Sequence, residues 1–217
     1  ELGNDFLGDV AAHGKNVVLS DQNDIFLFDI DVDQLLVVAT GHVTDGGFGD
    51  LVVAGNANLV GGEITLGDDT GNSTRFGSLT FSSSGAVSVA EDNDMNVSGV
   101  SAAGGGLNLW SSKDLFLAGP VDVIGDANLS ADDITVDAKF DATGDVLIVA
   151  TGNIDVNEDI DPTTVTLQSN DQITINAAVV ADDLIFVRAF QQSSLVVYLP
   201  LLLVLADPRG YKNGSSK

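Results

Sequence analysis

The stretch FGSLTFSSSGAVSVAEDNDMNVSG (residues 76–99) contains three short segments in which apolar and polar residues alternate. They are Leu79-Thr80-Phe81, Val87-Ser88-Val89 and Met95-Asn96-Val97, and small or polar residues fill most of the positions between them. An alternation of period two is typical of a strand with one buried face, and Gly, Ser, Asn and Asp are the residues that form tight turns. The stretch therefore predicts short strands joined by corners.

The same pattern recurs along most of the chain at a nearly constant interval. Equivalent segments begin 20 residues apart at 59 and 79, 87 and 107, 95 and 115, and 134 and 154, and the set 146, 165 and 184 advances by 19. A strand of three to five residues cannot bury a face alone, whereas coiling stacks each strand on its counterpart one turn later. The predicted fold is an all-β parallel β-helix of roughly nine coils, with about 19–20 residues per coil. The alternative is a β-sandwich, whose turns come at similar intervals.

The sequence also contains internal matches that are separated by several of these short periods. Residues 51–67 match 121–137, residues 77–92 match 144–159, and residues 16–27 match 106–117, all without gaps. The hexapeptides LVVATG (36–41) and LIVATG (147–152) match in the same way. These matches keep both the apolar positions and the turn residues, and they indicate duplicated modules.

Composition excludes several classes of function. The chain has 217 residues, of which 44% are apolar, so it is long enough to bury a core. The absence of cysteine excludes disulfides, thiolate metal sites and thiol catalysis. A formal charge of −24 excludes general binding to the phosphate backbone of nucleic acids. The acids are 28 Asp and 4 Glu, and Asp prefers turns, which indicates many tight corners and few helices.

The chain divides into three predicted regions. Residues 1–14 form an N-terminal edge or cap, residues 15–187 the β-helix repeats, and residues 188–217 an apolar and then basic tail. The tail contains LVVYLPLLLVLA (195–206), which is too short to span a bilayer. We expect it to cover the open end of the last coil. The alternatives are an anchor for a membrane or partner, or a segment outside the solenoid. No signal peptide is visible at the start of the sequence.

Candidate chemical sites are sparse. No G-x-S-x-G motif is present, and His13 and His42 are expected to be structural, so no catalytic residue and no cofactor site is predicted. Zinc ligands of the usual kinds are missing, but carboxylates in loops can bind calcium. The acidic segments 29–33, 91–94 and 157–161 are weak calcium candidates, and their alternative role is that of solvated corners. The candidate calcium ligands are Asp29, Asp31, Asp33, Asp92, Asp94, Asp159 and Asp161.

Two further features bear on binding. Phe26 and Phe116 fall at matching outward positions of the aligned segments 16–27 and 106–117, where they could form an exposed adhesive surface. Within residues 15–187 the basic residues are scattered in sequence, and they are Lys15, Arg75, Lys113 and Lys139. Polysaccharide cleavage would require Asp, Glu, Lys or Arg from adjacent coils to converge in one groove, and that convergence would distinguish an enzyme from a structural rod.

The stretches 76–99 and 55–67 (GNANLVGGEITLG) resemble the repeats of large bacterial surface and secreted proteins of the filamentous-haemagglutinin and autotransporter-passenger class. The resemblance covers about residues 15–187 and includes no catalytic motif. It implies a right-handed β-helix, an extracellular or cell-surface location, and a non-enzymatic role as a rigid acidic stalk or multivalent adhesive surface. The expected partners are glycans or proteins of a host or surface, with no nucleic acid and no membrane span. The chain is expected to be monomeric or joined end to end within a longer chain. A carbohydrate-active enzyme and a calcium-stabilised binding module are the alternatives.

Overall fold

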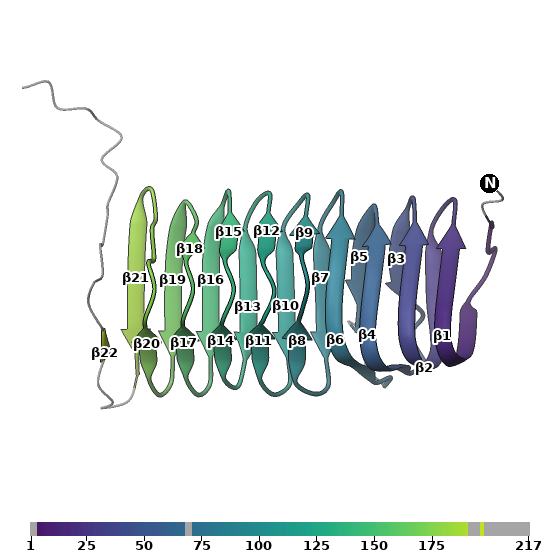
Figure 1. Ribbon diagram of the computed structural model, residues 1–217, viewed down its shortest axis with the longest axis horizontal. Coiled ribbons are helices and arrows are strands. Elements are labelled where there is room, and N and C mark those ends of the chain that lie inside the picture. Colours follow the sequence, from purple (N-terminus) through teal and green to yellow (C-terminus); the bar gives the residue numbers. More distant parts are fainter. Residues whose placement is uncertain (1–3, 68–70, 191–195, 198–217) are drawn as a thin grey trace, which may run out of the picture.

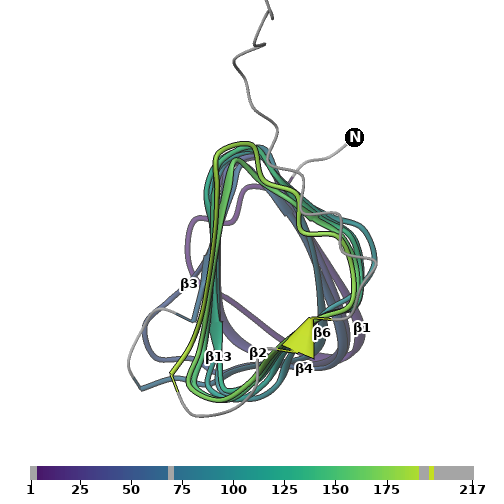
Figure 2. The same ribbon diagram turned by 90° about the vertical axis from the view of Figure 1, so that its left-hand side faces the viewer.

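Parallel pairing between successive turns organises the described part of the protein. The computed structural model describes residues 4–67, 71–190 and 196–197, and its regular elements are all strands. Each strand pairing is parallel. The turns stack into a rod (Figure 1) whose outline along the axis is roughly triangular (Figure 2). The predicted parallel β-solenoid is confirmed. The β-sandwich is wrong, because its sheets consist of antiparallel strands.

The strands lie on three sides of the rod, which we call faces A, B and C. Face A contains β3 (His42–Asp45), β5 (Glu63–Leu66), β7 (Val87–Glu91), β10 (Leu107–Ser111), β13 (Ala127–Ala131), β16 (Asp145–Ala150), β19 (Thr164–Ser169) and β21 (Leu184–Ala189). Face B contains β8 (Met95–Val97), β11 (Leu115–Leu117), β14 (Ile134–Val136), β17 (Ile154–Val156), β20 (Ile173–Ile175) and β22 (Val196–Val197). Face C contains β9 (Ser101–Ala103), β12 (Val121–Val123), β15 (Phe140–Ala142) and β18 (Ile160–Asp161).

The first turns are built from longer strands than the sequence pattern predicts. These strands are β1 (Val10–Asp21), β2 (Ile25–Ala39), β4 (Leu51–Gly61) and β6 (Thr74–Ser83), of 10 to 15 residues each. β6 pairs with β8 of face B and with β9 of face C, so one long strand serves two faces. The first residues of β2, Ile25–Leu27, pair with β3 and begin face A. Face A therefore has nine successive strands, as roughly nine coils require.

The length of a turn varies along the rod. The step from Ile25 to its partner Val43 is shorter than the later step from Ile64 to its partner Val87. Beyond Val87 the steps on face A have the nearly constant length that the sequence predicts. Two predicted spacings are wrong. Leu59 pairs with Phe81 and not with Leu79, and Leu184 pairs with Thr164 and not with Val165. The physical reason is that corners of different length change the step without disturbing the strands.

The interior is a continuous stack of apolar side chains. In one column of face A, the inward residues Val87, Leu107, Ala127, Val146 and Val165 follow one another in register, and each is at most 1% exposed. Their neighbours along each strand point outward, which is the alternation seen in the sequence. Full burial of a side chain of the size of Val or Leu stabilises the folded state by about 1.5–3 kcal/mol. Stacking in register therefore provides the core that a single short strand lacks.

The long internal matches do not superpose on the same face. Ile64 lies on face A, whereas Ile134, its match at an offset of 70, lies on face B. Val87 and its match Ile154 are related in the same way, and so are Ile25 and Leu115. Each matched pair is thus displaced by one side of the triangle. The matched unit is one strand with its corner, because all three faces need the same inward apolar residues and the same turn chemistry.

Aspartates at the corners connect one turn to the next. Asp24 Oδ1 accepts a hydrogen bond from the backbone N–H of His42 at 2.8 Å, and Asp126 Oδ1 accepts one from the N–H of Asp145 at 2.9 Å. In both cases the donor lies one turn after its acceptor. The same arrangement recurs at Asp45, Asp50, Asp114, Asp133 and Asp159. Hydrogen bonds to a charged acceptor are stronger than neutral ones, so much of the aspartate excess serves to hold corner N–H groups.

Removing one of these corner carboxylates is expected to destabilise the rod. Asp133 accepts the N–H of Asn153 and donates its own N–H to Asp114 at 3.3 Å, so it lies in a chain of three corners. Asp133→Ala is expected to lower the free energy of unfolding by about 1–3 kcal/mol, because the Asn153 N–H loses a charged acceptor. Asp133→Asn keeps a side-chain oxygen and is the matched control. Chemical denaturation of both variants measures the difference, and equal losses would contradict the corner role.

The ends of the solenoid differ slightly from the predicted boundaries. β1 begins at Val10, inside the region expected to be an edge or cap. β21 extends to Ala189, beyond the predicted end of the repeats at 187, and its inward residues Ile185 and Val187 are only partly buried. β22 adds to β20 on face B. Apart from the backbone of 196–197, the apolar segment 195–206 lies outside the described residues.

Candidate binding groove

A groove of about 520 Å³ follows face C in the later turns. It is formed by β12, β15 and β18 and by the corners that follow these strands. Three successive turns contribute an aspartate each, and the corners contribute hydroxyl and apolar groups. The lining includes Asp122, Ile124, Asp141, Thr143, Asp161 and Thr163.

The strand register places the three aspartates in one line. Asp122 pairs with Asp141, and Asp141 pairs with Asp161. Their neighbours on the strands, such as Phe140 and Ile160, point inward and are fully buried, so the aspartates point outward. Adjacent paired strands are about 4.8 Å apart, so the line carries one carboxylate per turn at that interval. Like charges paired directly across strands repel each other.

The corner beside the line is rigidly hydrogen-bonded. Thr163 Oγ1 donates to the backbone carbonyl of Thr143 at 2.9 Å, and Thr143 Oγ1 accepts the N–H of Gly125 at 2.9 Å. Asp182, from the following turn, adds a fourth carboxylate to the groove. The groove thus combines fixed hydroxyl groups with an ordered row of acids.

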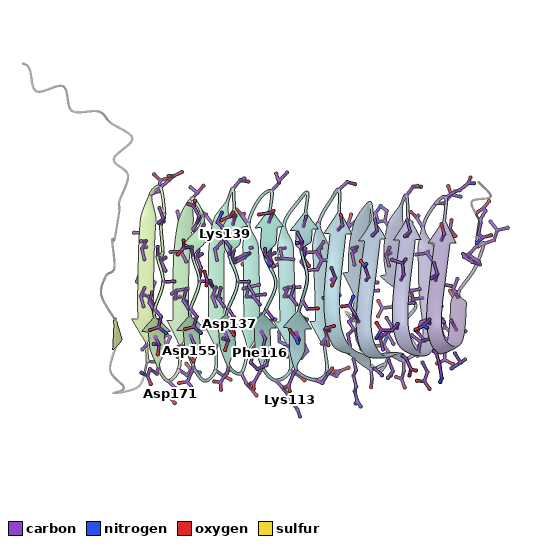
Figure 3. All side chains as sticks on the ribbon, viewed as in Figure 1. Lys113, Phe116, Asp137, Lys139, Asp155 and Asp171 are labelled. Atoms are coloured by element: carbon purple, nitrogen blue, oxygen red, sulfur yellow. The ribbon has the colours of Figure 1, made fainter. Side chains whose placement is uncertain are left out.

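Lys139 supplies a positive charge to the row. Its Nζ forms an ion pair with Asp141, and that hydrogen bond raises the pKa of the exposed Lys139 ammonium, with the charges of Asp161 and Asp122 acting in the same direction. Lys113 lies at the lower edge of the rod, away from Lys139 in its upper half (Figure 3). Lys139 therefore pairs with a carboxylate that lines the groove, whereas Lys113 lies away from it.

Loss of Lys139 is expected to weaken the later turns mainly at low salt. Lys139→Gln leaves the three stacked carboxylates without their cation, so the melting temperature should fall in dilute buffer. The difference from the unmodified protein should shrink in 1 M NaCl, where the screening length falls to about 3 Å. Lys113→Gln removes the same charge away from the row and is the control. The same loss for both variants at low salt would contradict a specific role of Lys139.

The calcium candidates of β2 point outward, and they do not surround a common point where an ion could bind. Asp29 Oδ2 lies 3.3 Å from His13 Nε2, and Asp31 and Asp33 are exposed on alternate positions of the strand. Residues at alternate positions share a face, but they are spread along it. In residues 4–67 and 71–190, no three His, Asp or Glu side chains are close enough together to hold a metal ion.

The other calcium candidates have different surroundings. Asp92 accepts the N–H of Thr74 at 3.0 Å, and Asp159 accepts the N–H of Ala178 at 3.1 Å, so both serve as corner acceptors. Asp94 is exposed beside β8. Asp161 is the one candidate that lines the groove.

The remaining candidates lie apart from the groove. His42 Nδ1 is 3.8 Å from Glu63 Oε2, its partner in register on the next turn, and both side chains are exposed. Phe26 is 43% and Phe116 36% exposed, but Phe26 lies on face A and Phe116 on face B. The two side chains therefore do not lie on one surface, because their matched segments are displaced by one face.

Sequence reasoning missed the groove although a usable signal was present. The spacings from Asp122 to Asp141 and from Asp141 to Asp161 equal the return distance of the solenoid. Applying that distance to polar residues as well as to apolar ones would have placed the three acids in one line. The groove can attract cations and can form hydrogen bonds with the hydroxyl groups of a sugar chain.

The chain was compared with known protein families, sequences and structures. No protein-family profile, curated protein sequence or solved structure matches the chain. The residues described by the structure also form no helix that is long and apolar enough to cross a membrane.

Proposed function

We propose that the chain is a non-enzymatic segment of an extracellular bacterial surface protein, where it acts as a rigid acidic stalk with a repeated binding surface. The observation that carries the proposal is the uninterrupted stack of parallel turns on face A, each turn continuing the same apolar column. Such a stack resists bending because every turn is joined to its neighbours by backbone hydrogen bonds along three faces. A rise of about 4.8 Å per turn holds groups on one end well away from the other.

The high negative charge supports the same function. The surface carries most of the 32 acidic residues, while the apolar residues of the alternating strands point inward. A large net charge of one sign keeps extended molecules soluble and discourages lateral association. The groove on face C offers the same carboxylate and hydroxyl groups in successive turns, so a long ligand can meet several weak contacts at once.

The experiment is a binding assay against arrays of glycans and matrix proteins, with the chain as a monomer and as a multivalent display on beads. We expect weak monomer binding that strengthens on display by about a hundredfold or more, as repeated contacts imply. The double variant Asp141→Asn, Asp161→Asn should lose that binding, and the variant Asp31→Asn, Asp33→Asn on β2, away from the groove, is the control of equal charge. Failure of the displayed protein to bind any array component would overturn the proposal.

Polysaccharide cleavage is a second candidate function, favoured by the row of acids in the groove. Glycoside hydrolysis uses two carboxyl groups about 5–5.5 Å or about 6.5–9.5 Å apart. Adjacent members of the row, such as Asp141 and Asp161, have strand positions about 4.8 Å apart, within reach of the shorter separation. Release of soluble sugars from a polysaccharide panel, abolished by Asp161→Asn, would establish cleavage. Binding without sugar release would exclude it for that panel.

A further inference from the structure

One corner inside the rod contains buried oxygen atoms that have no hydrogen-bond donor. It lies where β6 meets the end of β7, and we call it the Glu91 corner, comprising Asn72, Thr74 and Glu91. Glu91 and Thr74 are each 1% exposed. Glu91 Oε1, Thr74 Oγ1 and Asn72 Oδ1 are buried and lack a hydrogen-bond partner in the described part of the protein. All three atoms are oxygen, and each can donate an electron pair.

Glu91 is out of place in its column. It pairs with Ser111 of the next turn, and small residues occupy the same inward position in the turns that follow. These residues are Ala131, Ala150 and Ser169. Glu91 therefore places an acidic side chain in a part of the interior that later turns fill with small neutral groups. Burying a carboxylate is unfavourable unless a positive group or enough hydrogen bonds compensate it.

Contacts join the members of the corner. Glu91 Oε2 accepts the N–H of Phe76 at 3.1 Å, and Phe76 follows Thr74 at the next inward position of the same strand. The backbones are tied as well, since Asp92 N donates to Thr74 O at 2.9 Å and Thr74 N donates to Asp92 Oδ2 at 3.0 Å. The carboxylate and the hydroxyl therefore enter the same part of the interior.

Asn72 closes the corner on its outer side. Its Nδ2 lies 3.5 Å from Asp45 Oδ2, which also accepts the N–H of Gly67 at 2.8 Å. Gly67 has a φ of +75°, and a Cβ on it would lie 3.1 Å from Thr74 Oγ1 and 2.0 Å from the carbonyl oxygen of Ala90. A glycine is needed there because the chain passes so close to these oxygens. Asn72 is partly exposed, which gives the corner a route to solvent.

We propose that the Glu91 corner binds a calcium ion through side-chain oxygens of Glu91, Thr74 and Asn72. Calcium takes six to eight oxygen ligands, including carboxylates, amide carbonyls and water, and it tolerates irregular geometry. The nearest basic residue in sequence, Arg75, is exposed on the opposite side of β6, so it does not supply the missing charge. The site takes one carboxylate, Glu91, from the acidic segment 91–94, and its other ligands are a hydroxyl and an amide oxygen from the chain before β6 and at its start. The proposal is independent of the stalk function.

The test is thermal unfolding of the full chain with calcium and with a chelator, at constant ionic strength and neutral pH. We expect calcium to raise the melting temperature of the unmodified protein. Glu91→Gln should weaken the apparent calcium affinity by about tenfold or more, since even residues that only orient a ligand have effects of that size. Asp155→Asn removes the same charge from an outward position on face B and should keep the full response. This control separates the corner from general attraction of cations to an acidic surface.

A second variant tests whether the loss of the calcium response in Glu91→Gln comes from the loss of a calcium ligand or from a change in stability. Thr74→Val keeps the shape of the side chain but removes its oxygen, and it should reduce the calcium response while the chelator-treated protein still folds. An unchanged melting temperature with calcium, or an equal loss of response in Asp155→Asn and Glu91→Gln, would overturn the proposal. A response to sodium but not to calcium would overturn it as well.

Discussion

Replacing Leu109 with alanine is expected to destabilise the protein far more than replacing the larger Trp110 beside it. Leu109 points inward, is 2% exposed, and lies in register between Val89 and Leu129. Its truncation leaves a cavity between two stacked turns, for which losses of about 2–5 kcal/mol are typical. Trp110 points outward, is 47% exposed, and lies between Ala90 and Ser130, so Trp110→Ala should cost about 1 kcal/mol or less.

Urea unfolding of the two variants provides the measurement. If the protein is a solenoid, Leu109→Ala should have a much lower free energy of unfolding than Trp110→Ala. Far-ultraviolet circular dichroism before denaturation shows whether both variants retain the strand content of the unmodified protein. If the tryptophan variant were the less stable of the two, the assignment of inward and outward positions on β10 would be wrong.

Glu91→Gln is expected to stabilise the calcium-free protein at alkaline pH. Burial raises the pKa of Glu91 from 4.5 to about 8, with the charge of Asp92 adding to the increase and the hydrogen bond from Phe76 opposing it. The folded state therefore binds a proton that the unfolded state releases between about pH 4.5 and pH 8. The free energy of unfolding should fall through this window as pH rises. The loss is roughly 4–5 kcal/mol in total, at about 1.4 kcal/mol per pKa unit.

The glutamine variant lacks the titrating group but keeps an oxygen for the Phe76 N–H. Its advantage over the unmodified protein should be smallest below pH 4.5 and should grow until about pH 8. Denaturation in chelator at several pH values, with Asp155→Asn as the control, measures the difference. A constant difference across the range would show that Glu91 does not carry the buried proton.

The sequence was sufficient to predict the class of fold because the same apolar alternation returns at nearly the same interval in every turn. Val87-Ser88-Val89 and Leu107-Asn108-Leu109 have the same alternation, and the interval between them in the sequence is the interval between strands paired in register. Local pattern and long-range pairing therefore give the same answer. The constant interval fails where the corner length changes, as it does between Leu59 and Phe81. The alternation of apolar residues gives no information on how many residues a corner contains.

The long strands and the displaced internal matches could not be predicted for a related reason. In β2 the alternation is interrupted between the inward residues Val32 and Leu35, which two exposed residues separate, and only the structure shows that the strand continues there through a register shift. Ile64 and Ile134 share a sequence context but not a face. The face on which a residue lies depends on the lengths of all preceding corners. Small errors in the predicted corner lengths therefore accumulate along the chain.

The candidate sites were less predictable than the fold. The aspartates were counted in the sequence, but their division into corner acceptors such as Asp133 and groove residues such as Asp141 depends on where each turn bends. Glu91 gave no signal as a buried group, since acids in a Ser- and Asp-rich segment are usually exposed. Its burial follows from the place where the long β6 gives way to shorter strands.

The stacking of each turn on its immediate neighbours also determines how the chain can fold. A residue such as Val146 finds its partners Ala127 and Val165 only one turn away along the sequence in either direction. The loop that must close to add a turn is therefore short at every stage, and its entropic penalty does not increase steadily as the rod lengthens. Once a first turn has formed, it is a template for the second. A polypeptide of this kind can acquire its native structure progressively while it emerges from a ribosome or a narrow channel, without waiting for its far end.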